Sequence, residues 1–377
     1  MQRRQDSEWR NRVSFEIGSY LRPHILDMPA YEPILPYDVV SQELKIPMEK
    51  IVKLDANENP YGPLPEVRER LAALGNLHIY PDPESRRIRE MLAQYHQISK
   101  ENIVIGAGAD ELIDLIMRLV IDPGDVLINC PPTFGMYAFD GALNNARVLN
   151  LPRNLDFSLD YEDIAQAVKD FTPKLIYLAT PNNPDGSLLT TEQIETLLHL
   201  PLLVVLDEAY INFSTLSTGW IQDVDKYQNL FVLRSFSKWA GLAGLRIGYG
   251  VFPKNFVPRL LAAKQPYNIS VAAEEAACTT LSNIQKVDHV TALIVNERVR
   301  LQQRLNEISW LEPYPSQANF ILCRVGDRDA DTVKKNLREQ GILIRHFNKP
   351  GVTDHIRISV GKPEDSDRLL SALMKME

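Results

Sequence analysis

The sequence predicts an α/β protein: a large domain built on a mostly parallel sheet flanked by helices, plus a smaller α+β domain. Two observations lead to this prediction. Short apolar runs alternate with helical segments from about residue 62 onward, which is typical of strand–helix–strand units with right-handed crossovers. The chain also has 377 residues, more than one hydrophobic core usually supports.

The strands of the predicted large sheet are short runs of apolar, often β-branched residues. They lie at 103–105, 125–130, 174–179, 202–206 and 229–234. Two helices between them are clear from their periodicity. The segment 110–120 places Leu112 and Ile116 on one face, and 191–200 forms the second helix. Ligands of such sheets bind beyond the carboxyl ends of the strands, so we expect a site there.

After about residue 267 the pattern changes to that of a smaller α+β domain. A long charged helix is expected at about 285–308. The remaining elements, in chain order, are a strand at 318–325, a helix at 329–340, strands at 341–347 and 355–361, and a helix at 363–376.

We therefore expect an N-terminal arm at 1–50, a large domain at 51–266 and a small C-terminal domain at 267–377. Prolines at four positions between residues 23 and 36 favour an extended arm over a packed helix. Such an arm could pack on the small domain or wrap around a partner subunit. A loosely ordered tail remains equally open.

Composition restricts the partners and the compartment. A net charge of −8 argues against nucleic acid or an anionic membrane as the main partner. Cys130, Cys278 and Cys323 lie far apart in the sequence, which favours buried thiols in a reducing compartment over disulfides or a metal site. No apolar run reaches the ~20 residues that span a bilayer, and the N-terminus lacks a signal-peptide core. We expect a cytoplasmic protein.

Lys238 lies directly after a predicted strand, beside Ser235 and Ser237 and ahead of a glycine-rich stretch that contains Arg246. A lysine whose pKa is lowered by burial can form a Schiff base with an aldehyde. Hydroxyl groups and an arginine are suitable partners for a phosphate dianion. Taken alone, the S-x-S-K motif is more often a solvated loop.

Three further motifs follow predicted strands. The segment 103–116 runs from a strand through small residues into a helix, whose N-terminus favours an anion. It matches neither the dinucleotide fingerprint nor a P-loop. An apolar strand ends in Asp207, and a buried carboxylate there needs a cationic or hydrogen-bonding partner. The segment 179–189 holds Asn183 between prolines. Alone, these could be a tight turn, an N-cap and a plain turn.

Together the motifs occur in the order G-A-G-A-D-E, P-N-N-P-D-G, D-E-A-Y and S-F-S-K…G-L-R. In this combination the chain resembles the fold-type I pyridoxal-phosphate aminotransferases of class II. Within them it is similar to the histidinol-phosphate aminotransferase family. The matching segments, which span about residue 20 to the C-terminus, are L-R-P…Y-E-P (21–33), L-D-A-N-E-N-P-Y-G-P (54–63), Y-P-D-P (80–83), P-P-T-F-G-M-Y (131–137) and D-E-A-Y-I-N-F (207–213).

The resemblance implies roles around a pyridoxal 5′-phosphate cofactor. Lys238 would form the Schiff base with the cofactor aldehyde and then carry the proton during catalysis. Asp207 would pair with the pyridinium nitrogen, and Asn183 and Tyr210 would hydrogen-bond the ring oxygen. Phe134 would stack on the ring; many relatives have tyrosine there, so a hydroxyl is lost.

The resemblance also implies a set of residues that hold the cofactor phosphate. Where Ala109 stands, relatives often have serine, so this position would contribute only its backbone N–H. Tyr61 would reach the phosphate from the other subunit of a homodimer. The set within one subunit is Ala109, Asp110, Ser235, Ser237 and Arg246.

Substrate anions need cations of their own. Arg357 matches the family's arginine for the acidic group of the substrate. Arg345 and Tyr31 are further substrate-binding candidates, and Asn57 would lie near the substrate. For Arg345 a solvated strand edge is equally open. His346 and His355 are expected at the surface rather than in catalysis.

The implied reaction is a two-stage transamination. L-Glutamate would give its amino group to the cofactor and leave as 2-oxoglutarate, and imidazole-acetol phosphate would then become histidinol phosphate, as a step of histidine biosynthesis. Alternatives within the fold are a broad aromatic aminotransferase and a threonine-phosphate decarboxylase. A catalytically silent ligand-binding protein is disfavoured, because both Lys238 and Asp207 are present.

Overall fold

The computed structural model describes residues 16–26, 28, 35–216 and 218–376. The chain divides into two units, the first ending at Pro33. Within the first, the described residues form a short 3-10 helix, Ile17–Tyr20, and a single helical turn, α1 (Pro23–Leu26). Tyr31, a predicted substrate residue, lies outside the described residues.

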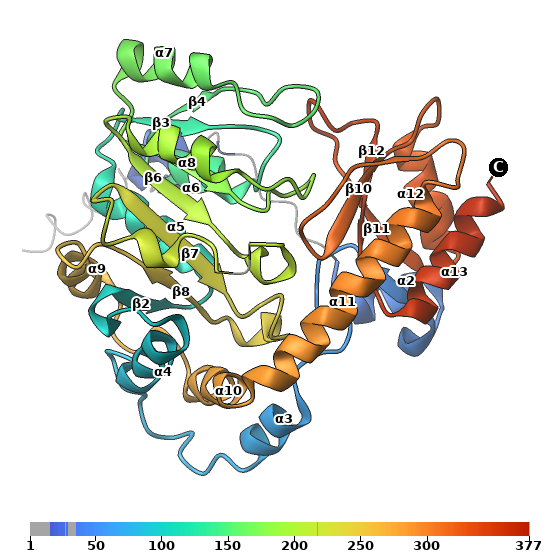
Figure 1. Ribbon diagram of the computed structural model, residues 1–377, viewed down its shortest axis with the longest axis horizontal. Helices are drawn as coiled ribbons and strands as arrows, with labels where there is room; N and C mark the ends of the chain where they lie inside the picture. Colours follow the sequence, from blue (N-terminus) through green and yellow to red (C-terminus); the bar gives the residue numbers. More distant parts are fainter. Residues whose placement is uncertain (1–15, 27, 29–34, 217, 377) are drawn as a thin grey trace, which may run out of the picture. The chain divides into compact units, whose positions relative to one another are not determined.

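A seven-stranded sheet forms the centre of the larger part of the second unit (Figure 1). Its order is β2-β8-β7-β6-β5-β3-β4, and every pairing is parallel except the two made by β8. The predicted mostly parallel sheet is confirmed, while β4 and β8 are additions. The strands are β2 (Ile103–Gly106), β3 (Val126–Asn129), β4 (Arg147–Asn150), β5 (Leu175–Ala179), β6 (Leu203–Asp207), β7 (Leu230–Ser235) and β8 (Gly248–Val251).

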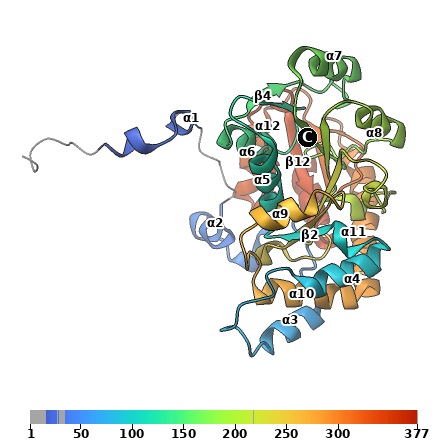
Figure 2. The same ribbon diagram turned by 90° about the vertical axis from the view of Figure 1, so that its left-hand side faces the viewer.

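Helices cover both faces of this sheet, because alternate strand residues point to opposite sides. In β2, for example, Ile103 and Ile105 belong to one apolar core and Val104 to the other. The first face carries α4 (Arg86–His96), α7 (Tyr161–Phe171), α8 (Thr191–Leu198) and α10 (Val271–Ser282), with α3 (Pro65–Ala72) packed on α10. The other face carries α5 (Ala109–Val120), α6 (Met136–Leu143) and α9 (Val257–Ala263), as Figure 2 shows from the side.

A second, five-stranded sheet has the order β1-β11-β12-β10-β9. Its edge strand β1 comes from far earlier in the chain than its neighbour β11, with which it pairs in parallel. The strands are β1 (Val52–Leu54), β9 (Glu312–Pro313), β10 (Phe320–Arg324), β11 (Ile342–His346) and β12 (His355–Ser359). They pack with α12 (Ala330–Glu339) and α13 (Pro363–Met374) around an apolar core of their own. The predicted strands and helices of this region are confirmed.

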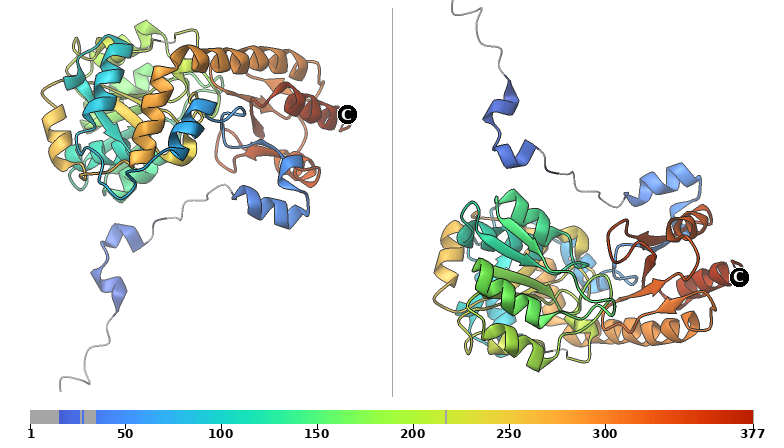
Figure 3. Two further views of the ribbon diagram at one scale, coloured as in Figure 1. Left: turned by 90° about the horizontal axis from the view of Figure 1, so that it is seen from below. Right: turned by 90° about the horizontal axis from the view of Figure 1, so that it is seen from above.

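The long helix α11 (Ile284–Leu305) belongs to both cores. Val287 and Ile294 pack into the core of the seven-stranded sheet, whereas Leu301 and Leu305 pack into that of the five-stranded sheet. Figure 3 shows the helix reaching from one sheet to the other. The two sheets are therefore joined by a continuous, rigid element.

One expectation for the N-terminal arm is wrong. Residues Tyr37–Leu44 form a helix, α2, where an extended segment was expected. Pro36 precedes the helix as its N-cap, a place where proline breaks no helical hydrogen bond. Val40 then packs against Ile51 and Leu343. The predicted domain limits at residues 50 and 266 stay a prediction.

Candidate active site

Two of the predicted motifs meet across strand β8. Gly248 is opposite Ser235 of β7 on one side and opposite Gly106 of β2 on the other. A Cβ atom at Gly248 would lie 2.6 Å from the backbone nitrogen of Ala109, so only glycine allows this approach. The end of β7, which leads to Lys238, therefore lies beside the start of α5.

The start of α5 and Arg246 form a cradle suited to a phosphate. Gly108 precedes the helix with a φ of +82°, which glycine adopts without strain. A Cβ there would lie 2.5 Å from Arg246 Nη2, so the guanidinium rests directly on this turn. Arg246 Nη2 forms an ion pair of 2.7 Å with Asp110 Oδ2, and both side chains are about half exposed. Helix N-terminal N–H groups with an arginine are a suitable anion site.

Two serines complete this side of the site. Ser235 and Ser237 are both buried, and Ser235 Oγ accepts a 3.0 Å hydrogen bond from the Ser237 backbone nitrogen. That bond leaves the Ser235 proton available for an outside acceptor. The predicted phosphate residues of one subunit are thus brought together around the ends of β2 and β7.

Asp207, the last residue of β6, is buried, and both of its carboxylate oxygens accept hydrogen bonds. Oδ2 accepts a 2.7 Å hydrogen bond from Tyr137 Oη, and Oδ1 accepts a 3.0 Å bond from the backbone nitrogen of Ala209. Burial raises the pKa of Asp207 to about 6, and the two hydrogen bonds oppose that rise. No cation of the described chain forms an ion pair with Asp207. A buried, fixed carboxylate of this kind fits a protonated ring nitrogen.

Lys238 lies close to Tyr210. Its Nζ is 5.9 Å from the centre of the Tyr210 ring and donates a 3.2 Å hydrogen bond to the carbonyl oxygen of Ala56. Tyr210 Oη accepts a 3.0 Å bond from Asn57 Nδ2. The lysine is half-buried and has no carboxylate partner within the described ranges.

Asn57 is held in a left-handed backbone conformation, with a φ of +55°. Its backbone nitrogen donates to Ser359 Oγ at 2.8 Å, and Ser359 Oγ donates to Asn57 Oδ1 at 2.9 Å. Asn319 Nδ2 donates to the Asn57 carbonyl oxygen at 3.0 Å. Strain of this kind persists where the surroundings fix it, often at functional sites. Ser359 and Asn319 were missed, because these contacts join residues far apart in sequence.

Arg357 on β12 is buried and reaches the large sheet. Its Nη1 donates to Asn183 Oδ1 at 2.6 Å, and its Nη2 donates to the carbonyl oxygen of Asp55 at 2.8 Å. The Asn183 amide therefore keeps its N–H groups as donors for a ligand. Both predicted residues lie at one site, which joins the two sheets.

The other predicted residues surround this centre more loosely. Phe134 contacts Tyr137 edge-on, with ring centres 5.5 Å apart. Arg345 is opposite Arg357 across β11 and β12. Tyr61 is half-buried, with Lys362 Nζ 5.6 Å from its ring centre. Its predicted contact with a second subunit stays a prediction.

Tyr137 and Lys349 are further residues that sequence reasoning missed. Tyr137 lies in the P-P-T-F-G-M-Y motif, three residues after Phe134. This spacing could have indicated that the two side chains lie close together. A Cβ atom at Gly135 would lie 3.4 Å from Lys349 Nζ. The loop that follows β11 thus brings the Lys349 ammonium group close to the turn that contains Phe134. No sequence motif predicts this contact.

The expectation that both histidines lie at the surface is wrong for His355. It is buried, and its Nδ1 lies 2.7 Å from Asp354 Oδ1. Burial lowers its pKa despite this carboxylate. His355 is the first residue of β12, and its ring packs on that of Phe157 with ring centres 5.8 Å apart.

Three further properties hold across the described residues. None of their helices has the length and apolar character needed to cross a bilayer. Nowhere among them do three or more His, Cys, Asp or Glu side chains gather so that they could hold a metal ion. The three cysteines are buried and unpaired, as predicted.

Comparison with known proteins agrees with this arrangement. The model of the family described as aminotransferase class I and II matches residues 49–373. The chain is 52% identical over 370 residues to the chloroplastic histidinol-phosphate aminotransferase of Nicotiana plumbaginifolia, covering 98% of this chain and 89% of that relative.

Solved structures share the fold. The histidinol-phosphate aminotransferase of Sinorhizobium meliloti in complex with pyridoxal-5′-phosphate superposes with a TM-score of 0.86 at 29% identity, covering 95% of this chain and 97% of the other. The L-threonine-O-3-phosphate decarboxylase of Porphyromonas gingivalis superposes with a TM-score of 0.77 at 28% identity, covering 86% and 99%.

Proposed function

This chain belongs to the histidinol-phosphate aminotransferases of the class I and II aminotransferase family. We propose from this premise that it transfers the amino group of L-glutamate to imidazole-acetol phosphate, which gives 2-oxoglutarate and histidinol phosphate, or runs in reverse. The chain is a pyridoxal-phosphate-dependent aminotransferase. The observation that carries the substrate proposal is the high identity to relatives of that name along nearly the whole chain.

Bound pyridoxal 5′-phosphate supplies an aldehyde and an electron-withdrawing ring that stabilises negative charge at the substrate carbon. Arg246, Ser235 and the N–H groups that begin α5 would bind its phosphate. Asp207 would hold the ring nitrogen protonated, since the carboxylate is buried and pairs with no cation among the described residues. These contacts fix the ring relative to the sheet.

Lys238 Nζ would hold the cofactor through its aldehyde and would move the proton at the substrate α-carbon. Tyr210 Oη accepts from Asn57, so its own proton would be available to the ring oxygen of the cofactor. Asn183 would donate to the same oxygen, because Arg357 occupies its acceptor. Asn57 thereby sets the direction of the Tyr210 hydroxyl, and Arg357 sets that of the Asn183 amide.

Substrate recognition rests on cations contributed by the five-stranded sheet. Arg357 presents a planar fork that suits a carboxylate or phosphate. Arg345 and Lys349 are placed to receive the second acidic group, the phosphate of histidinol phosphate. Glutamate also has two acidic groups, which allows one site to serve both substrates.

We also propose a cytoplasmic homodimer without nucleic-acid or membrane partners. Support for the dimer comes from the exposed aromatic pair Tyr80 and Tyr267, stacked with ring centres 4.6 Å apart, since a second subunit would cover such a patch. Sedimentation of the purified protein tests the dimer, and a monomer at working concentrations would exclude it.

The reaction is tested by mixing holoenzyme with L-glutamate and recording the cofactor absorbance. A shift to the spectrum of the amino form, reversed by imidazole-acetol phosphate, is the expected result. No shift with cofactor bound would exclude transamination.

A second candidate is decarboxylation of threonine phosphate, favoured only by the structural likeness to a decarboxylase of that substrate. Carbon dioxide release from threonine phosphate, without amino transfer from glutamate, would support it. Rates on histidinol phosphate, phenylpyruvate and threonine phosphate separate these activities from a broad aromatic aminotransferase.

A further inference from the structure

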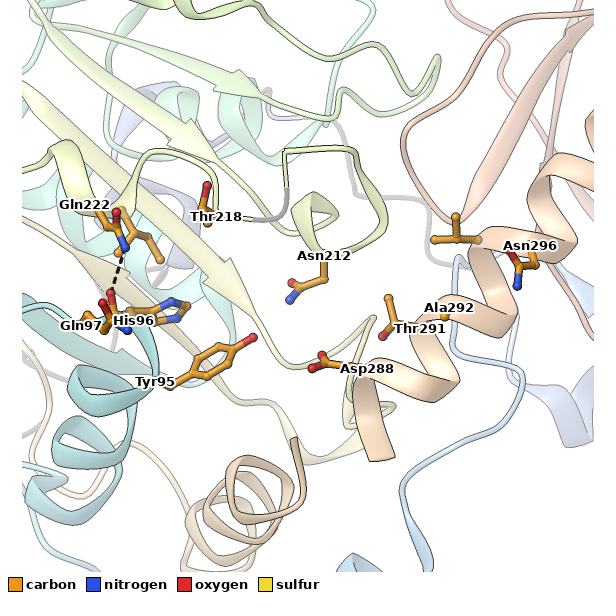
Figure 4. Close-up of a pocket in the computed structure, with 12 residues that line it drawn as sticks. Tyr95, His96, Gln97, Asn212, Thr218, Gln222, Asp288, Thr291, Ala292 and Asn296 are labelled. Carbon is orange, nitrogen blue, oxygen red and sulfur yellow. Dashed lines mark hydrogen bonds between the residues drawn. The ribbon is translucent and has the colours of Figure 1, made fainter. Parts of the chain in front are cut away.

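A cavity of about 590 Å³ lies between α4, α11 and the segment that connects β6 to β7 (Figure 4). Its walls are the end of α4, two short turns, η5 (Ile211–Phe213) and η6 (Ile221–Asp223), and the first half of α11. None of the residues predicted to bind cofactor or substrate lines it. It is large enough for a small organic molecule.

The cavity contains a buried polar group without a partner. Thr291 lines it and is only 8% exposed, and its Oγ1 makes no hydrogen bond within the described structure. Leaving such a hydroxyl unsatisfied is costly, so orphaned groups of this kind point to a bound molecule. Figure 4 shows Asn212 and Tyr95 turned toward the same space.

The charge of the lining is negative. Asp288 is the one carboxylate among the lining residues, and it forms no ion pair in the described chain. Desolvation raises its pKa, which a cation beside it would oppose. His96 does not supply that cation, because burial lowers its pKa to about 3. Its Nε2 is instead 2.7 Å from Tyr249 Oη.

We propose that this cavity binds a small planar organic cation of the guanidinium or imidazolium type. Such a cation carries several N–H donors in one plane. Asp288, the Thr291 hydroxyl and the Asn212 amide oxygen are acceptors for them, and the Tyr95 ring offers a face for the positive charge. Phosphorylated substrates are repelled by Asp288, so the cavity is distinct in chemistry from the active site.

The cavity is joined to the strands that carry the catalytic groups. Arg234 Nη2 donates a 2.6 Å hydrogen bond to the carbonyl oxygen of Thr218, a lining residue. The same nitrogen forms a buried 2.8 Å ion pair with Glu208. Glu208 follows Asp207, and Arg234 precedes Ser235. Because this ion pair adjoins both sites, we expect binding in the cavity to change the affinity for substrate, and substrate to change the affinity of the cavity by the same factor.

The test is calorimetric titration of the holoenzyme with ethylguanidinium, which has no primary amine to react with the cofactor. Asp288 is exposed, so solvent screens its charge, and a dissociation constant on the order of 1 mM is expected. Ethylurea, which has nearly the same shape without the charge, should not bind. Equal binding of the two compounds would overturn the proposal.

Two variants locate the site. Asp288→Asn should weaken ethylguanidinium at least tenfold, and Thr291→Val about threefold, while circular dichroism and cofactor absorbance confirm folded holoenzyme. Asp122→Asn changes an exposed aspartate outside the cavity and should bind as wild type. Two results would contradict the proposal, because each would place the cation elsewhere. One is undiminished binding of ethylguanidinium to both folded cavity variants. The other is an effect of ethylguanidinium on turnover that persists in Asp288→Asn.

Discussion

The hydroxyl of Tyr137 donates a 2.7 Å hydrogen bond to Asp207 Oδ2, and both side chains are buried. Burial alone pushes the pKa of Asp207 upward, toward the neutral acid. Tyr137 opposes this, because it donates to the ionised form. The tyrosine therefore positions the carboxylate and helps to keep it charged for the ring nitrogen.

Replacing Tyr137 with phenylalanine should slow turnover with little effect on substrate binding. Losing a donor to a buried carboxylate costs about 1–3 kcal/mol, and we expect kcat to fall about tenfold with the KM for glutamate unchanged. Steady-state kinetics and the cofactor absorbance against pH measure both effects.

Tyr177→Phe is the matched control. Its ring stacks on that of Tyr137 with centres 5.1 Å apart, but its hydroxyl donates to the carbonyl oxygen of Ile113 at 3.0 Å and not to Asp207. The variant should lose about 1 kcal/mol of stability and keep kcat within about twofold. Equal kcat losses in the two variants would show that the Asp207 bond is not the cause.

Asp140 should make the folded protein less stable as the pH rises. Burial, with the nearby Asp114 and Asp110, raises its pKa from 3.8 to about 7. The folded state then holds this proton more tightly than the unfolded chain. The stabilisation is present below about pH 4 and is lost as the pH rises to about 7, on the order of 4 kcal/mol in total.

The variant Asp140→Asn should remove that dependence. Urea unfolding at pH 5 and pH 8 should show the wild type losing more stability between the two than the variant, and at pH 8 the variant should be the more stable. An identical loss in both proteins would mean that Asp140 titrates normally. Asp122→Asn serves as the exposed control.

Arg357→Lys should weaken the binding of glutamate. A lysine has a single ammonium group, so it cannot keep the bonds to Asn183 and Asp55 and still offer a fork to a carboxylate. We expect the KM for glutamate to rise about tenfold or more. Arg324→Lys, on the neighbouring strand and half exposed, should leave the KM unchanged. Similar changes in both variants would argue against a direct role.

Lys349→Met should discriminate between substrates. If Lys349 receives the phosphate, the KM for histidinol phosphate should rise about tenfold, while unphosphorylated histidinol should react as with wild type. Lys254→Met, which removes an exposed lysine with a surface ion pair to Asp225, is the control. An unchanged KM for histidinol phosphate would remove Lys349 from the site.

Local patterns were sufficient for much of this structure. The strand that ends in Asp207 is wholly apolar, and the turn that holds Lys238 follows another such strand, so both were placed from sequence. Strand β8 was not, because Gly248 and Gly250 have low strand propensity. Its structure depends on the approach of β2 and β7, where a side chain at Gly248 would collide with the start of α5.

Contacts between distant segments were beyond local reasoning. Val52–Leu54 becomes a strand because it pairs with Ile342–Ile344, which lies near the other end of the sequence. The network that fixes Asn57 likewise depends on Ser359. A pattern of residues reveals which chemistry each strand end can offer, whereas the packing of the two sheets decides which residues meet.

The central claim is that Lys238 holds the cofactor, and one measurement tests it directly. Holoenzyme is treated with borohydride, digested, and its peptides are weighed by mass spectrometry. The cofactor mass should appear on the peptide that contains Lys238, and Lys238→Ala should bind no cofactor covalently and lose amino transfer. Cofactor found on a different lysine, or turnover retained in Lys238→Ala, would contradict the account.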